Sequence, residues 1–301
     1  MKRIFILMLA VTLLFCMSAC GNSEEQTVTE GTPAAPETEA TETEAVTPPP
    51  TEAEATETEA VTTPSTEAEE NQETEALTTL DSGFLWTGVE WRIYDNGLLE
   101  ITGDGPMAPV LNSEDIKWHA YRTMIKDVYI GDGITTVSQF AFRDCVNLQT
   151  VRFPESLEKI ELEAFERCSA LKEIRLPEGL TQIEYWAFAG CDALETLEIP
   201  GSITHLDNYT FQACLNLREV VIRPGVETIG FDVFDGCVNL QKIYIPYSVT
   251  KIDVYTFREC EKLADVYFSG TEQQWKEMIL EAEGNDPLFL AKVHYDAEYG
   301  A

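Results

Sequence analysis

Apolar residues recur along this chain with a fixed spacing of 23 residues. Six cysteines mark the period, the third residue after each of them is leucine, and the sixth and eighth are also apolar. A phenylalanine stands three residues before each cysteine. The six are Cys145, Cys168, Cys191, Cys214, Cys237 and Cys260. Because a constant period of about 20 to 50 residues is the signature of stacked repeats, the sequence predicts a solenoid.

Each repeat is predicted to hold one short strand and one return turn. The alternation in Ile174, Arg175 and Leu176 is typical of a strand, and a proline follows most of these strands and ends them. The segment "AFERC" (164–168) and its equivalents predict a short helix or 3-10 turn, with phenylalanine and cysteine pointing inward. One repeat cannot bury its apolar side alone, so copies stack into seven strands and six complete turns.

The repeated cysteines could pair, bind metal, attack a substrate or fill space. Disulfides between stacked, equivalent side chains must meet a demanding geometry. Zinc sites need Cys and His about two to four residues apart, and the repeat has no such spacing. No histidine recurs beside the cysteines to activate a thiol. Recurrence in register with leucine and phenylalanine columns favours a small buried core residue.

Both flanks carry patterns of their own. Residues 91–107 predict a β-hairpin with an Asn-Gly turn. Together with three tryptophans, this hairpin is expected to cover the first rung: Trp86, Trp91 and Trp118. Downstream, Thr271 and Gln274 have the spacing of a capping box that opens a helix, and 291–295 offers a last strand. The expected organisation is an N-terminal β cap at 81–122, repeats at 123–268 and a C-terminal cap at 269–301.

Residues 1–20 have the pattern of a secretory signal peptide. Lys2 and Arg3 precede an apolar run that is too short to span a membrane. The segment ends in Met-Ser-Ala-Cys, which resembles a bacterial lipobox, although Met17 stands where an aliphatic residue is usual. The resemblance implies lipidation of Cys20 and anchoring of the exported chain to the bacterial cell membrane, with display at the cell surface. Ordinary cleavage without a lipid is the alternative.

Residues 21–80 differ from the rest of the chain in composition. They contain 16 Glu and 16 Thr, with no aromatic residue, no Lys and no Arg. Such a segment cannot bury enough apolar surface to offset the entropy of ordering, so a disordered stalk is predicted. The whole chain has 53 acidic and 20 basic residues. This balance disfavours nucleic acid and leaves a lipid anchor as the expected contact with a membrane.

The sequence offers no candidate residues for catalysis, metal binding or cofactor binding. The three histidines are far apart and unaccompanied: His119, His205 and His294. The carboxylates are abundant, but no pair is set in an apolar pocket by a readable pattern. The glycine turns at 103–107 and 131–133 lack the Lys-Ser/Thr of a phosphate loop. We therefore expect neither an enzyme nor a cofactor.

The strand residue between the two buried apolar positions points away from the core and is the place to look for a ligand site. The candidate ligand-binding residues in this column are Tyr129, Arg152, Arg175, Glu198, Tyr244 and Tyr267. Tyrosine and arginine dominate interface hot spots, although aromatic residues also simply suit strands. A second, weaker group lies on the turns: Trp186, Tyr209 and Tyr255.

The repeats resemble the BspA-like leucine-rich repeat family of bacterial surface proteins. Its pattern is matched by "LKEIRLPEGLTQIEYWAFAGC" (171–191) and "LQKIYIPYSVTKIDVYTFREC" (240–260). The resemblance implies a leucine-rich-repeat solenoid and a non-enzymatic adhesion module that attaches to host matrix proteins, host cells or other bacteria. The alternatives are an envelope spacer without a specific ligand and a carbohydrate-binding accessory protein that stacks sugars on exposed tyrosines.

Overall fold

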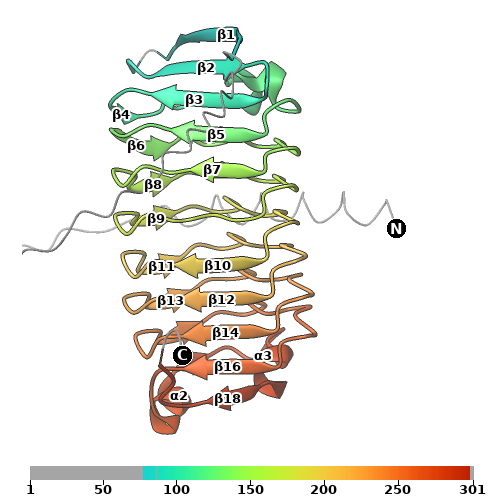
Figure 1. Ribbon diagram of the computed structural model, residues 1–301. Helices are drawn as coiled ribbons and strands as arrows, with labels where there is room; N and C mark the ends of the chain where they lie inside the picture. Colours follow the sequence, from blue (N-terminus) through green and yellow to red (C-terminus); the bar gives the residue numbers. More distant parts are fainter. Residues whose placement is uncertain (1–76, 86, 299–301) are drawn as a thin grey trace, which may run out of the picture. The chain divides into compact units, whose positions relative to one another are not determined.

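The computed structural model describes residues 77–85 and 87–298, which form a stack of rungs (Figure 1). Neighbouring rungs pair in parallel with an offset of 23 residues, so that Glu219 lies opposite Lys242 and Lys242 opposite Asp265. The predicted solenoid is confirmed. The predicted signal peptide, Trp86 and residues 299–301 lie outside the described residues, as does the predicted stalk up to residue 76.

A first row of strands covers one side of the stack. Its two five-stranded sheets contain β1 (Thr79–Phe84), β2 (Glu90–Tyr94), β3 (Leu98–Thr102), β5 (Asp127–Ile130) and β7 (Thr150–Arg152), then β10 (Thr196–Ile199), β12 (Glu219–Ile222), β14 (Lys242–Ile245), β16 (Asp265–Phe268) and β18 (Lys292–His294). The strand predicted around Ile174 does not form, and the ladder is interrupted there. The interruption separates the two sheets.

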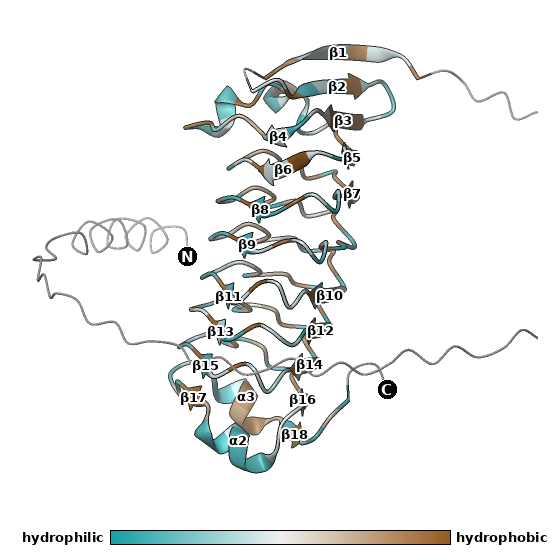
Figure 2. Cartoon of the chain, turned by 90° about the vertical axis from the view of Figure 1, so that its left-hand side faces the viewer, coloured by the Kyte–Doolittle hydropathy of each residue, from teal (hydrophilic) through white to brown (hydrophobic). Residues whose placement is uncertain are grey.

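A second row of shorter strands stabilises the opposite edge of each rung. It comprises β4 (Gly105–Pro106), β6 (Ile134–Val137), β8 (Lys159–Ile160) and β9 (Gln182–Ile183), then β11 (His205–Leu206), β13 (Thr228–Ile229), β15 (Lys251–Ile252) and β17 (Ile279–Leu280). Most of these strands have only two residues, so the sequence shows no alternating pattern from which they could be predicted. Apolar and polar segments recur from rung to rung in both rows (Figure 2).

The return turns differ from the short helix or 3-10 turn that the sequence predicted. The N–H groups of Phe140, Phe142 and Asp144 donate to carbonyls of the next rung, whereas the N–H groups between them donate three residues back. Each turn also holds two left-handed residues four apart, such as Glu163 (φ 54°) and Arg167 (φ 61°). Left-handed residues interrupt a right-handed helix, so these segments form a ladder of stacked turns instead.

All six repeat cysteines are free and buried, as predicted. The thiol of Cys168 donates to the carbonyl oxygen of Phe142 in the preceding rung, 3.2 Å away, and that of Cys260 donates equally to Phe234. The same contact recurs for the three cysteines between them. Burial raises the pKa of the Cys145 thiol to about 12. Cysteine is therefore a small apolar residue here whose thiol also donates to a buried carbonyl.

A stack of phenylalanine rings runs through the core beside the thiols. Phe142 and Phe165 lie 4.9 Å apart between ring centroids, and Phe165 and Phe188 lie 5.1 Å apart and nearly parallel. The stack begins at Trp118, whose ring lies 5.9 Å from Phe142 and whose indole N–H donates to the Ala141 carbonyl. Offset stacking adds about 0.5–1.5 kcal/mol per pair to the burial of these large side chains.

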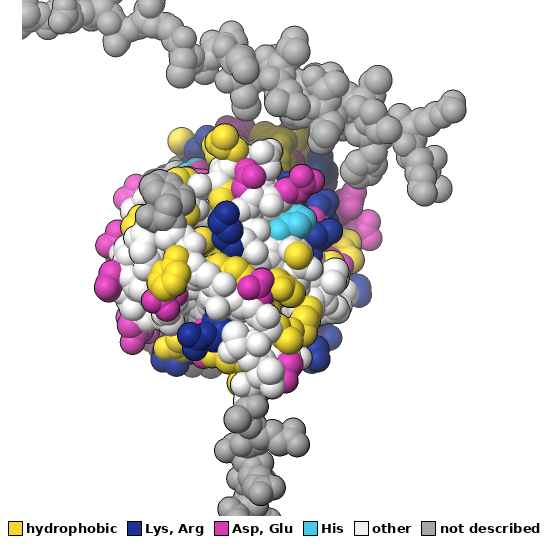
Figure 3. All heavy atoms as spheres, turned by 90° about the horizontal axis from the view of Figure 1, so that it is seen from above, with side chains coloured by type: hydrophobic (Ala, Val, Ile, Leu, Met, Phe, Trp, Pro, Cys, Tyr) yellow, Lys and Arg dark blue, Asp and Glu magenta, His cyan; other side chains and the backbone are white. Residues whose placement is uncertain are grey.

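At the N-terminal end, β2 and β3 form the predicted hairpin, and β1 adds an antiparallel strand that begins inside the predicted 21–80 segment. Gly97 in its turn has φ 93°, a conformation that favours glycine. The 3-10 helices η1 (Ser113–Asp115) and η2 (His119–Tyr121) follow. Viewed from this end, apolar, acidic and basic side chains are mixed, with no patch of a single charge (Figure 3).

At the C-terminal end, the helix α2 (Glu272–Glu277) begins at Thr271. The predicted capping box is present, because Thr271 and Gln274 exchange side-chain and backbone hydrogen bonds. The short helix α3 (Asp286–Leu290) follows, and β18 then pairs in parallel with β16. The last rung thus continues the ladder of the repeats without belonging to their 23-residue period.

The buried thiols predict low reactivity in the native chain. We expect the six repeat cysteines to resist Ellman's reagent at about pH 8, because all six are buried and the core excludes the reagent. In concentrated guanidinium all six should react. Absorbance of the released thiolate measures both states, and rapid labelling of several thiols in the native chain would contradict a buried column.

Candidate binding surface on the strand face

The structure places the predicted column on the outer face of the first row of strands, divided into three groups. Tyr129 lies opposite Arg152, and Tyr244 lies opposite Tyr267. Arg175 belongs to the rung that forms no strand, next to Glu198 on β10. The predicted residues therefore share a face, but they do not make one continuous site.

The N-terminal group is a cation–π pair. The guanidinium of Arg152 lies 5.0 Å from the ring centroid of Tyr129. In the same two strands, the hydroxyl of Thr150 donates to Asp127 at 2.5 Å. The arginine covers one face of the tyrosine ring, so this pair presents a positive charge and a ring edge to solvent.

The central group combines a paired carboxylate with an unpaired guanidinium. Glu198 accepts a hydrogen bond of 2.6 Å from Nε of Arg223. Arg175 is exposed and has no hydrogen bond, ion pair or ring contact with any residue in the described part of the chain. Its five donors are therefore available to a partner.

The C-terminal group is a stack of three rings. Tyr244 and Tyr267 lie 4.6 Å apart and nearly parallel, and His294 on β18 continues the stack at 4.6 Å from Tyr267. Nε2 of His294 also lies 2.7 Å from a carboxylate oxygen of Asp265. The rings cover one another's faces, so their edges and hydroxyls meet solvent. His294 follows Tyr267 by 27 residues rather than 23, which is why the repeat spacing did not reveal it.

The turns carry a second aromatic strip, which extends the weaker group predicted from the sequence. Trp186 and Tyr209 stack at 4.6 Å, Tyr209 meets Phe231 edge to face at 5.3 Å, and Phe231 meets Tyr255 in the same way at 5.4 Å. All four are half-buried. Phe231 was not predicted, because it lies one position earlier in its repeat than the others. These rings mainly pack against one another.

Two charged clusters lie on the return turns. Arg258 forms a bidentate pair with Asp235, at 2.8 Å to each oxygen, and lies 3.3 Å from the buried Asp232. Desolvation raises the pKa of Asp232 to about 7, more than the nearby Arg258 lowers it. In the other cluster, burial and the neighbouring Glu166 raise the pKa of Glu163 to about 7 against the opposing effect of Arg143.

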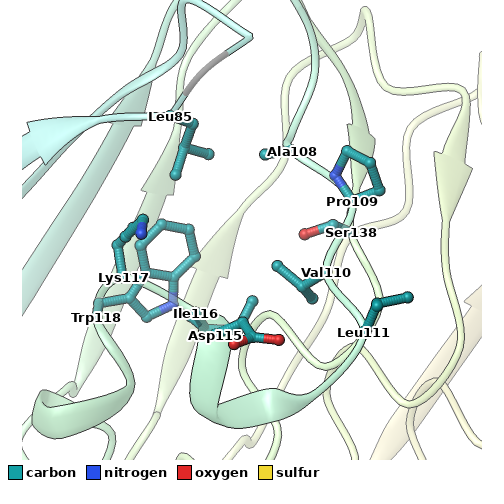
Figure 4. Close-up of a pocket in the computed structure, with 10 residues that line it drawn as sticks. All are labelled: Leu85, Ala108, Pro109, Val110, Leu111, Asp115, Ile116, Lys117, Trp118 and Ser138. Atoms are coloured by element: carbon teal, nitrogen blue, oxygen red, sulfur yellow. The ribbon is translucent and has the colours of Figure 1, made fainter.

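A pocket of about 250 Å³ opens near the N-terminal end (Figure 4). Its walls are mostly apolar, with Leu85, Val110 and Trp118 among them, and its charged residues are Asp115 and Lys117. Within residues 77–85 and 87–298, no group of three or more His, Cys, Asp or Glu is placed to hold a metal ion. No described helix is long and apolar enough to span a membrane.

Comparison with known proteins identifies the repeats. A family model described as the BspA type Leucine rich repeat region matches residues 135–264 in six copies. The repeat region belongs to the BspA-type leucine-rich repeat family. No curated protein matches the chain.

Solved structures similar to this chain include bacterial leucine-rich repeat proteins. A T. pallidum leucine-rich repeat protein is 18% identical with a TM-score of 0.47, and covers 71% of this chain and 99% of its own. One from Bacteroides ovatus is 19% identical with a TM-score of 0.44, and the match covers 69% of this chain and 70% of the other. A leucine-rich cell surface protein from Faecalibacterium prausnitzii is 24% identical with a TM-score of 0.31, and the match covers 54% of this chain and 65% of the other.

The buried carboxyl of Asp232 predicts a stability that falls as pH rises. Its pKa of about 7 in the folded chain exceeds the unfolded value of about 4, so the folded chain binds the proton more tightly. The free energy of unfolding should therefore decrease between about pH 4 and 7. Asp232→Asn should remove part of this slope and, above pH 7, stabilise the chain by roughly 2 kcal/mol. Arg258 still has Asp235 as its partner in this variant.

Chemical denaturation across this pH range measures the slope. Glu261→Gln on the exposed surface is the matched control and should leave the slope unchanged. Because Glu163 titrates in the same window, Asp232→Asn combined with Glu163→Gln should flatten the profile further. Equal slopes in the wild-type and Asp232→Asn chains would show that Asp232 has the same pKa in the folded and unfolded states, which would contradict the prediction.

Proposed function

We propose that the chain is a non-enzymatic binding or adhesion module, displayed outside the cell, whose strand face contacts an extracellular or host-surface protein. The observation that carries this proposal is the outer face of the first row of strands. Tyr244 and Tyr267 are half-exposed there on paired strands, and the unpaired guanidinium of Arg175 is exposed on the rung between β7 and β10. These residue types supply most of the energy of protein interfaces.

The arrangement of the rings favours a protein over a glycan. A sugar binds an aromatic side chain by lying on the face of the ring. On this surface the inner ring faces are taken, because Tyr244, Tyr267 and His294 stack on one another and Arg152 lies over Tyr129. Exposed edges and hydroxyls suit hydrogen bonds and lateral packing with another protein.

The same surface favours a binder over an inert spacer. A spacer needs only a solvated, charged face, and the salt bridge between Glu198 and Arg223 would serve that purpose. Half-exposed aromatic rings at two places and an unpaired arginine between them exceed that requirement. The core alone does not require them, since its apolar columns point the other way.

We expect the strand face to lose its ligand when its tyrosines are removed. The full chain and the variant Tyr129→Ala/Tyr244→Ala/Tyr267→Ala are screened by biolayer interferometry against matrix proteins and a glycan panel. A protein ligand should be bound by the wild type and weakened at least about tenfold in the variant, since two or more hot-spot contacts are lost.

Tyr247→Ala is the control for that screen, because Tyr247 is 61% exposed and lies outside the column. Circular dichroism checks that all variants stay folded. A protein ligand that the triple variant retains would move the site away from the strand face, and a glycan ligand lost by the variant would replace protein with carbohydrate. The absence of any ligand would favour the spacer.

Display at the surface is proposed to depend on a lipid at Cys20. In a bacterial host fed an alkyne-tagged fatty acid, the full chain should carry the label and sediment with membranes. Cys20→Ala should lose both, because a diacyl anchor at about 0.8 kcal/mol per buried methylene holds a chain stably to a bilayer. Cys16→Ala, inside the same segment, is the matched control and should keep the label. An unlabelled but exported wild type would favour ordinary cleavage.

A further inference from the structure

The ladder of the first row opens at a single rung, residues 173–176, between β7 and β10. In the described chain no backbone–backbone hydrogen bond involves these four residues. The bonds just before them are long, at 3.4 Å from the Lys172 N–H to Gln149 and 3.4 Å from the Glu195 N–H to Lys172. The equivalent bonds from Arg218 and Gln241 in later rungs measure 2.9 Å. Peptide groups of this rung are therefore left without ladder partners.

Like charges flank the opening on the side of β7. Arg152 and Arg175 occupy equivalent positions on successive rungs, and like charges directly opposite destabilise strand pairing. Arg152 is turned over the ring of Tyr129, away from Arg175. Farther along the same column, Glu198 faces Val221 and Tyr244 faces Tyr267, and these rungs are fully paired.

A groove of about 470 Å³ lies over the opening and crosses three rungs. Leu176 and Leu197 on its floor are buried, and Ile174 and Val221 are half-buried. This volume falls within the range of about 300–1,000 Å³ that is typical of pockets for small ligands or a few side chains. It therefore suits a short extended segment and is too small for the face of a helix.

The charge of the groove is negative. Its lining contains four glutamates and one arginine: Glu173, Glu178, Glu198, Glu219 and Arg175. Only Glu198 among these carboxylates has an ion-pair partner in the described residues, namely Arg223. Three unpaired carboxylates around an apolar floor favour a ligand that carries positive charge and some apolar surface.

We infer that this groove binds an extended segment of a partner protein with lysine or arginine at alternate positions. Alternate side chains of an extended segment point the same way, so cations can reach Glu173 and Glu219. Apolar residues of the segment cover Ile174 and Val221. Arg175 donates to main-chain carbonyls of the segment, and the unpaired peptide groups of 173–176 offer further hydrogen bonds. This assignment rests on the proposed protein-binding function and adds the chemistry of the partner.

The test uses the full chain and a fluorescein-labelled octapeptide of alternating lysine and valine, with fluorescence anisotropy as the readout. The reference peptide replaces every lysine with glutamate. The lysine peptide should bind at least about tenfold more tightly, and its affinity should fall as salt screens the carboxylates. Equal binding of the two peptides would overturn the assignment.

Two paired variants locate the site. Glu173→Gln/Glu219→Gln should weaken binding of the lysine peptide at least about fivefold, because both carboxylates line the groove. Glu227→Gln/Glu261→Gln removes the same charge from exposed positions outside it and should change affinity less than about twofold. Equal losses in the two variants would mean that any acidic surface suffices, and the groove would not be a site.

Hydrogen exchange provides a readout independent of charge. Amides of residues 173–176 should exchange faster than those of β12, and the lysine peptide should slow them. Exchange as slow as in β12 would show a closed ladder and overturn the inference. Failure of the peptide tests, with a protein ligand still lost by the triple tyrosine variant, would leave the proposed function standing and the groove assignment wrong.

Discussion

Each rung of this solenoid depends on its neighbours for the hydrogen bonds of its peptide groups. A rung is too short to pair with itself, so the N–H and C=O groups of its strands point along the stack to the rungs on either side. The return turns obey the same requirement, because every second N–H in 140–145 donates to the next rung. Within the repeats, one offset of 23 residues pairs both rows of strands at the same time.

The composition of the core follows from that offset. Equivalent residues must lie directly above one another, so each core position becomes a column of similar side chains. A phenylalanine column stacks its rings at about the rung spacing, with centroids 4.9 to 6.0 Å apart. Beside it, the carbonyls of the phenylalanines from Phe142 to Phe234 each accept a thiol from the next rung in a narrow space. A cysteine supplies a thiol at 3.2 to 3.5 Å without adding the bulk of a larger side chain.

The repeat period, the buried columns, the hairpin and the capping box could be predicted from the sequence, because each depends on residue types at fixed spacings. The turns could not. Glu163 and Arg167 adopt left-handed conformations that their side chains do not favour, and only the hydrogen bonds to neighbouring rungs impose them. His294 escaped prediction because the last connection is four residues longer than the repeat. It reaches the tyrosine stack through the pairing of β18 with β16.

Residues on the outer face of the strands need not resemble their equivalents in neighbouring rungs, unlike residues of the core. The outward-pointing strand column can therefore hold three different groups of side chains. Where similar rings meet, as at Tyr244 and Tyr267, the column reinforces the ladder. Where two arginines occupy successive rungs, at Arg152 and Arg175, the ladder opens over residues 173–176. The core beneath this rung stays closed, with Leu171, Phe165 and Cys168 fully buried. A solenoid can therefore vary its outer surface, and even leave backbone groups unpaired there, while the columns below keep the fold intact.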